Sequence, residues 1–159
     1  MKKMNNKGFS LVELIVVVLI MAIIAVALAP QVMKWVENSR KSTDANNYDS
    51  VVSAVNLALA DENVMKLIGA QSGDIVLYWG SSTATTTGDT WDLPTLSAGS
   101  TGVSATAFAD KIAGILGTSW NSDMKVKRTT ELPTTPWSIT ISNIGTVTRS
   151  SSPDTSSVS

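Results

Sequence analysis

The chain has 159 residues, 43% of them hydrophobic and 16% charged, with a formal net charge of −1. It contains no cysteine and no histidine, which excludes disulfide frameworks, cysteine-rich zinc sites and catalysis by Cys or His. The near-neutral charge, without a basic patch, argues against nucleic-acid binding. Residues 14–31 contain no charged side chain, so the composition predicts an apolar rod joined to one polar domain.

The N-terminus has the composition of a membrane span. Lys2, Lys3 and Lys7 precede an apolar run over residues 9–29. A helix of that length is about 30 Å long, which matches the hydrocarbon core of a bilayer. The positive-inside tendency places the lysines in the cytoplasm and the remainder of the chain outside.

Two simple interpretations of this span are incomplete. A secretory signal peptide has a shorter apolar stretch, and here Pro30 is followed by more helix-compatible sequence. A plain single-pass anchor fits the length but does not require Glu13. An ionisable group within a span costs about 2.5–3.5 kcal/mol on insertion scales and usually has a partner.

The segment KGFSLVEL, residues 7–14, resembles the class III signal of type IV prepilins and type II secretion pseudopilins, and is most similar to that of a major type IV pilin. The resemblance implies that a prepilin peptidase cleaves between Gly8 and Phe9, that the new amine of Phe9 is N-methylated, and that the apolar segment becomes a filament core. Pro30 falls where many pilins also carry proline. Because proline has no N–H, a kinked or loosened helix is expected there.

Glu13 acquires a partner in this scheme. The trimmed Phe9 carries a positive amine, and a pair at about 4 Å gains roughly 4 kcal/mol at an effective dielectric of 20. The hypothesis is that Glu13 pairs with the Phe9 amine of the adjoining subunit and sets axial register. Phe9 and Glu13 are four residues apart on one helix face, so an intrachain pair is also open, although it would not explain polymerisation.

The helical pattern continues beyond Pro30. Val32, Trp35 and Val36 make a short apolar stripe, and residues 39–47 are polar all round. A second apolar face, suited to docking on a sheet, then recurs at helical spacing. It comprises Tyr48, Val51, Val52, Val55 and Leu59. The helix is predicted to extend to about Glu62 or Leu67, with Gly69 as its stop.

The remaining segments predict a small, mostly antiparallel sheet and one short helix. Strands are expected at residues 74–79, 124–130, 137–144 and 146–149, with a turn at 143–145. Residues 80–102 are expected to form a long loop, or strands whose positions the sequence does not define. Ser104 is expected to cap a helix over residues 105–116 that ends at Gly117. Its predicted inward side chains are Phe108, Ile112 and Ile115. The fold class is therefore α+β, and the order of elements resembles the pilin fold.

The predicted organisation has five parts. They are a cleaved leader at 1–8, a membrane and filament-core half-helix at 9–29, an amphipathic half-helix at 30–68, a globular head at 69–149 and a disordered tail at 150–159.

Other polar residues are given structural roles. Lys125, Lys127 and Arg128 are expected on a solvated sheet face. The sparse acids Asp89, Asp92, Asp123 and Asp154 show no calcium-ligand spacing and are assigned to turns. Ser122 and Lys125 have no recognisable catalytic context. No enzyme activity, metal or cofactor is predicted.

Two functions from different classes follow. The first is a structural subunit of an extracellular type IV pilus for adhesion, motility or surface attachment. The second is a pseudopilin of a type II secretion or competence system; a membrane-anchored binding domain that does not assemble is a distant third. Expected partners are copies of itself, with minor pilins as further candidates, prepilin peptidase, the assembly machinery, and the membrane before assembly. The absence of cysteine departs from the disulfide loop of many Gram-negative pilins and mildly favours a Gram-positive source.

Overall fold

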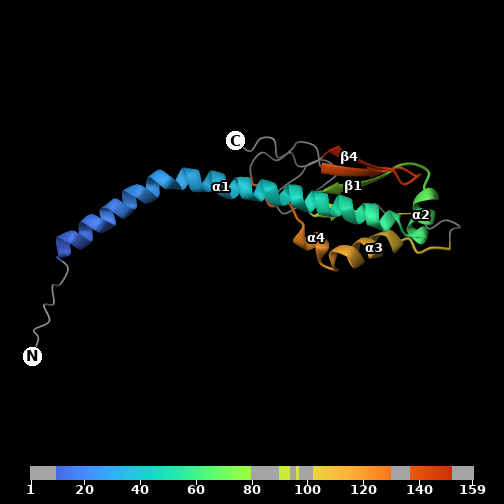
Figure 1. The fold of residues 1–159 in the computed structure, drawn as a ribbon, viewed down its shortest axis with the longest axis horizontal. Coiled ribbons are helices and arrows are strands. Elements are labelled where there is room, and N and C mark those ends of the chain that lie inside the picture. The colour runs from blue at the N-terminus through green and yellow to red at the C-terminus, as the bar shows by residue number, and fades with distance from the viewer. Residues whose placement is uncertain (1–9, 80–89, 94–95, 97–101, 130–136, 152–159) are drawn as a thin grey trace, which may run out of the picture. The chain divides into compact units, whose positions relative to one another are not determined.

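The computed structural model describes residues 10–79, 90–93, 96, 102–129 and 137–151. The predicted leader, most of the central loop and the last eight residues of the predicted tail lie outside these ranges. The chain divides into two compact units, Met1–Val36 and Glu37–Ser159. Helix α1, Leu11–Leu59, contributes residues to both units (Figure 1).

Helix α1 confirms the long helix predicted from the sequence. Its 49 residues include no glycine, and Pro30 is its single proline. The helix assignment continues without interruption through Pro30. Glycine is the residue that most destabilises a helix interior after proline, so its absence favours one continuous element.

The helix ends earlier than predicted. Asp61 has an extended backbone (φ −84°, ψ 127°), and its side chain accepts a hydrogen bond from the N–H of Asn63 at 3.0 Å. Asp61 therefore caps a separate helix, α2, over Glu62–Gly69, as a short acidic side chain favours. A single helix through Glu62 or Leu67 is wrong, whereas Gly69 as a helix end is confirmed. The hydrogen bond from Lys111 to Asp61, at 2.9 Å, is the main cause that lowers the pKa of Asp61.

The head contains a four-stranded antiparallel sheet. Its strands are β1 Ile75–Trp79, β2 Trp91–Asp92, β3 Trp137–Ile141 and β4 Val147–Ser151, in the order β2-β1-β3-β4. Alternate residues of β1 and β3 face each other directly, in the pairs Ile75–Ile141, Leu77–Ile139 and Trp79–Trp137. All six side chains are buried, so this face of the sheet lines the core. The α+β class and the small antiparallel sheet are confirmed.

The β3–β4 hairpin differs from its prediction at both ends. Strand β3 stops at Ile141 because a turn follows, in which the N–H of Gly145 donates to the Ser142 carbonyl at 2.8 Å. Gly145 has φ +83°, a conformation that glycine adopts most readily. Strand β4 continues to Ser151, two residues into the segment predicted as a tail.

The strand predicted at residues 124–130 is wrong over its described part, 124–129. This segment follows the short helix α4, Trp120–Asp123, and is irregular. Its backbone N–H groups at Lys127, Arg128 and Thr129 donate to carboxylates of α1. Because these donors are satisfied by side chains, the segment needs no neighbouring strand.

Helix α3 spans Ala107–Leu116 and begins two residues later than predicted. Ser104 does not cap it directly. Its Oγ instead accepts the N–H of Thr106, the residue before the helix, at 3.3 Å. Gly117 ends the helix with φ +98°, as predicted. Phe108 and Ile112 are buried and Ile115 is half-buried.

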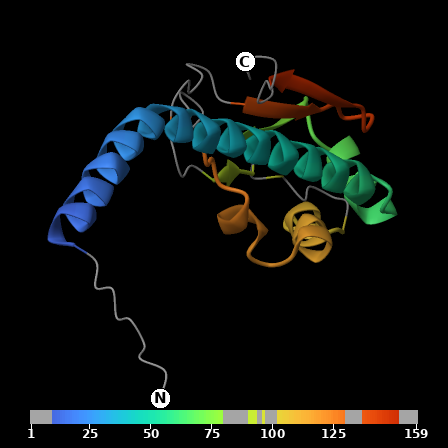
Figure 2. The ribbon, with the colours of Figure 1, turned by 60° about the vertical axis from the view of Figure 1, so that its left-hand side comes forward.

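The core lies along the second half of α1. The five apolar residues predicted to dock on the sheet, Tyr48, Val51, Val52, Val55 and Leu59, are all buried. Strands β3 and β4 lie above this part of α1, and α3 and α4 lie below it (Figure 2). Trp79 stacks on Trp91 with ring centroids 5.3 Å apart and lies 5.0 Å from Trp137. Trp120 is buried as well. Four of the five tryptophans therefore anchor the core, because large aromatic rings bury the most apolar area.

Candidate functional site

The candidate site is the N-terminal part of α1 together with Ser10, the first residue that the structure describes. Gly8 and Phe9, the predicted cleavage and methylation residues, lie outside the described residues. Glu13 and Pro30 lie within α1. The cleavage, methylation, register and helix-kink roles given to these four residues stay predictions.

The Glu13 side chain caps the N-terminus of α1. The carbonyl of Ser10 accepts the N–H of Leu14 at 3.2 Å, and Glu13 Oε2 accepts the N–H of Ser10 at 2.9 Å. A glutamate three residues after the cap that reaches back to the N–H of the cap forms half of a capping box. An acidic side chain in the first turn also interacts favourably with the helix dipole. Ser10-Leu11-Val12-Glu13 has the S-x-x-E spacing of this motif, a signal that the sequence reading overlooked.

The apolar residues that follow are exposed on every side of the helix. Large apolar side chains between Leu11 and Leu28 range from 47% exposed at Val16 to 76% at Val26. By length and composition, α1 is able to cross a membrane. A helix that is apolar all round is stable only where lipid or other helices surround it. This segment therefore requires either a membrane or contacts with other apolar helices.

Two carboxylates of α1, those of Glu37 and Asp44, accept hydrogen bonds from the head segment at residues 127–129. Glu37 Oε1 accepts the N–H of Thr129 at 2.6 Å, and Glu37 Oε2 accepts the Thr129 hydroxyl at 2.8 Å. Arg40 adds hydrogen bonds to both residues, at 3.3 Å to Glu37 and 3.2 Å to Thr129. Asp44, seven residues after Glu37, lies on the same helix face and binds the same head segment.

Asp44 is fully buried, although residues 39–47 are polar and were predicted to be so all round. Its Oδ1 accepts the N–H of Lys127 at 2.7 Å, and its Oδ2 lies 3.1 Å from both the backbone nitrogen and Nε of Arg128. Arg128 is 4% exposed and its guanidinium lies 4.5 Å from the ring centre of Trp137. The sheet face predicted for Lys125, Lys127 and Arg128 is wrong because the segment is irregular. Lys125 is exposed, as predicted, and Lys127 is half-buried, whereas Arg128 pairs with α1 inside the head.

Sequence reasoning missed Glu37 and Asp44. Their seven-residue spacing was a usable signal, since it places two acids on one face of a helix. Metal binding has no candidate in the described part of the chain, where no group of three or more potential ligands converges. Asp123 is exposed, whereas Asp89, Asp154 and the side chain of Asp92 lie outside the described residues.

Comparison with known proteins identifies the N-terminal segment. Residues 3–29 match the prokaryotic N-terminal methylation motif. No curated protein and no solved structure matches the chain significantly. The matched residues include Gly8, Phe9 and Glu13 and end one residue before Pro30. This chain therefore carries the class III signal peptide of type IV pilins and pseudopilins.

Proposed function

We propose that the protein is a structural subunit of a type IV pilus. It is made as a membrane-anchored precursor with its leader in the cytoplasm and its head outside. Cleavage after Gly8 then allows it to polymerise through α1 into a surface filament for adhesion, motility or attachment. The observation that carries the proposal is the apolar surface of α1 from Leu11 to Leu28, which is exposed all round and lies within the residues that match the methylation motif.

In this scheme the apolar part of α1 lies first in the membrane and then in the filament. In the precursor, lipid surrounds the apolar side chains. In the filament, the same side chains pack against helices of other copies. Close packing between helices then takes the place of their contacts with lipid. Partners in this scheme are prepilin peptidase, the assembly machinery, other copies of the chain, and minor pilins.

Glu13 has a defined place in the proposal. Its carboxylate already accepts the Ser10 N–H at 2.9 Å, and an ionised carboxylate has capacity for further hydrogen bonds. We propose that the Phe9 amine of the adjoining subunit donates a hydrogen bond to the Glu13 carboxylate and that this ion pair sets the axial register. Pro30 is proposed to allow the helix to loosen locally when copies pack together.

Mass spectrometry tests the processing step. Protein from cells that contain prepilin peptidase is expected to begin at Phe9 and to carry one added methyl group. Gly8→Val is expected to retain the leader, while Asn6→Val, a matched change within the leader, is expected to be processed. A wild-type chain that retains residues 1–8 would refute the precursor scheme.

Two substitutions at Glu13 separate its possible roles. Glu13→Val removes both the charge and the bond to Ser10. Glu13→Gln keeps an acceptor for that bond and removes only the charge. If the ion pair sets register, both variants are present in the membrane at normal levels and neither enters filaments. Normal filaments from Glu13→Gln would show that Glu13 acts only as a helix cap.

Electron microscopy of cells that overexpress the protein separates a pilin from a pseudopilin. Long surface fibres that contain the protein and form without a secretion channel support the pilus subunit. Fibres that require a secretion channel support the pseudopilin. Monomeric protein that stays in the membrane with its leader intact refutes both.

A further inference from the structure

One tryptophan differs from the other four. Trp79, Trp91, Trp120 and Trp137 are at most 5% exposed, whereas Trp35 is 63% exposed. Val32 is three residues before Trp35 and four before Val36, so it neighbours both on the helix surface. All three side chains are exposed. We call Val32, Trp35 and Val36 the Trp35 patch. It follows the apolar run of residues 9–29 and extends that exposed apolar surface beyond the span.

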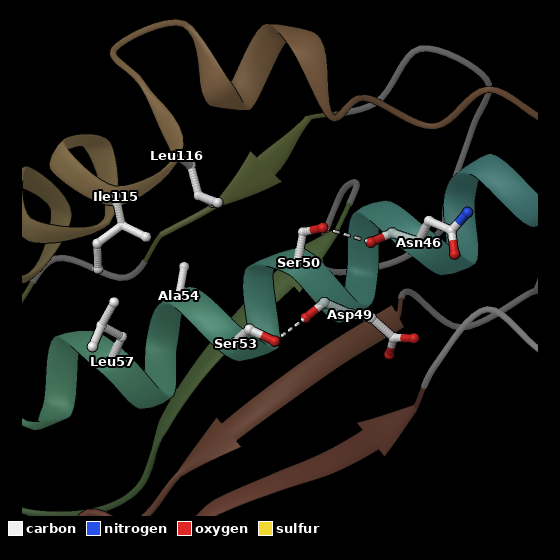
Figure 3. Close-up of a pocket in the computed structure, with 8 residues that line it drawn as sticks. All are labelled: Asn46, Asp49, Ser50, Ser53, Ala54, Leu57, Ile115 and Leu116. Carbon is white, nitrogen blue, oxygen red and sulfur yellow. Dashed lines mark hydrogen bonds between the residues drawn. The ribbon is translucent and has the colours of Figure 1, made fainter.

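An open groove of about 600 Å³ lies between α1 and the end of α3 (Figure 3). We call it the α1–α3 groove. Its apolar wall consists of Ala54 and Leu57 from α1 and Ile115 and Leu116 from α3. Leu57 projects toward Ile115 and is 56% exposed. The volume lies within the roughly 300–1,000 Å³ of sites that enclose small ligands, so it has room for a large aromatic side chain.

The other edge of the groove offers hydrogen-bond acceptors. The hydroxyl of Ser50 donates to the Asn46 carbonyl at 2.8 Å, and that of Ser53 donates to the Asp49 carbonyl at 2.8 Å. With their protons engaged, these hydroxyl oxygens present only lone pairs. Figure 3 shows Ser50 on the same side of α1 as Leu57. Asn46 and Asp49 also line this edge, and the Asp49 carboxylate pairs with Arg149 at 2.8 Å. An occupant that combines an apolar surface with an N–H donor therefore complements the groove.

The indole of tryptophan has this combination, a large apolar ring and a single N–H that only donates. We propose that in the filament the α1–α3 groove of one subunit binds Trp35 of a neighbouring copy. This inference rests on the proposed function, because it needs copies to assemble. A filament that buries residues 9–29 between copies also brings the adjoining Trp35 patch against neighbouring subunits.

Cysteine crosslinking tests the contact directly, because the chain has no native cysteine. One tagged copy carries Val36→Cys, next to Trp35 in the patch, and a second copy carries Ser53→Cys at the groove. Oxidation of filaments that contain both is expected to give covalent dimers. Lys34→Cys is the matched control, since residue 34 lies about 200° from residue 36 around the helix. It is expected to give about tenfold fewer dimers, and equal or absent crosslinking from both pairs would overturn the contact.

Substitutions provide an independent readout. Trp35→Ala and Leu57→Asp are each expected to lower the amount of filament about tenfold, as for a central interface residue. Trp35→Phe keeps an aromatic ring but removes the N–H donor, so it is expected to lower the amount of filament less than Trp35→Ala does. Adding Ser50→Ala to Trp35→Phe is expected to cause no further decrease. Asn56→Asp places the same charge one residue from Leu57, outside the groove, and is expected to assemble normally.

The outcomes separate this inference from the proposed function. Wild-type cells without filaments would refute both. Wild-type filaments together with normal assembly of Leu57→Asp would refute the groove contact alone. If Trp35→Ala lowers the amount of precursor in the membrane fraction while Leu57→Asp behaves normally, Trp35 is a lipid anchor and the groove contact is overturned.

Discussion

Asp44 and Arg128 form a buried ion pair, with Arg128 Nε 3.1 Å from Asp44 Oδ2. The two residues come from α1 and from the irregular segment at 124–129, and their side chains are 0% and 5% exposed. Asp44 also accepts the backbone N–H groups of Lys127 and Arg128. One helix carboxylate therefore provides the hydrogen bonds that a neighbouring strand would otherwise supply.

Replacing Asp44 is expected to destabilise the head strongly. Asp44→Ala leaves two backbone donors and the Arg128 guanidinium without this acceptor in a buried site, at a cost of about 3–5 kcal/mol. Asp44→Asn retains one acceptor oxygen and is expected to lose less. The free energy of unfolding is measured by urea titration of the detergent-solubilised protein, followed by tryptophan fluorescence.

Asp49 provides the control for this prediction. It pairs with Arg149 at 2.8 Å, but the two side chains are 56% and 52% exposed. Because exposed pairs contribute little, Asp49→Ala is expected to change stability by less than about 1 kcal/mol. If Asp44→Ala and Asp49→Ala lower the free energy of unfolding equally, burial does not explain the contribution of the Asp44–Arg128 pair.

Glu37 is expected to protect the backbone of Thr129. Glu37→Ala removes the acceptor 2.6 Å from the Thr129 nitrogen, and a hydrogen bond to a charged group contributes about 1.5–3 kcal/mol. Hydrogen exchange of the Thr129 amide is therefore expected to accelerate about tenfold or more. Glu37→Gln keeps an acceptor and is expected to give a smaller change. Unchanged exchange in Glu37→Ala would show that this contact does not hold the segment.

Tyr48 is expected to make the head sensitive to alkaline pH. Burial raises the pKa of Tyr48 to about 12, from an ordinary value of 10.0. Below pH 10 the folded and unfolded chains both carry the neutral phenol, so its contribution to stability is complete. Between about pH 10 and 12 the unfolded chain ionises first, and the free energy of unfolding falls by about 1.4 kcal/mol per pH unit.

Tyr48→Phe tests this dependence. The substitution removes the hydrogen bond from the Tyr48 hydroxyl to the Ser138 carbonyl, 2.8 Å long, and is expected to lose about 1 kcal/mol at neutral pH. Above pH 10 its stability is expected to fall less steeply than that of the wild type. Tyr78→Phe, at a half-buried strand position, is the control and should retain the steep fall. Parallel pH profiles for the wild type and Tyr48→Phe would refute the assignment.

Gly145 is expected to be required in the β3–β4 turn. An alanine Cβ at this position would lie 2.9 Å from Met65 Cε, and the backbone has φ +83°. The left-handed conformation alone costs a non-glycine residue about 1–2 kcal/mol, so Gly145→Ala is expected to lower the melting temperature by several degrees. Gly73→Ala, where no atom lies within 4 Å of the added Cβ, should be close to neutral. Met65→Ala combined with Gly145→Ala should recover only the part of the loss that comes from contact.

Patterns between near neighbours in the chain were sufficient to predict much of this protein. The apolar run, the buried face from Tyr48 to Leu59, strand β1 and the glycine that ends α3 were all predicted from local spacing, and the methylation motif from its resemblance to the class III signal of type IV prepilins. Each depends on residues within a few positions of one another, because helix and strand periodicity are local properties. The division at Asp61 was also encoded locally, as a helix cap that the sequence reading did not use.

Only the tertiary structure decided what the polar residues do. The alternation around Lys125 to Arg128 has the period of a strand, yet the segment is irregular because Asp44, 84 residues away from Arg128, takes its backbone donor. The burial of Asp44 within a polar stretch has the same cause. A carboxylate is buried where distant donors surround it, and no local pattern contains that information. The apolar half of α1 is the opposite case, since its need for a partner follows from its sequence alone.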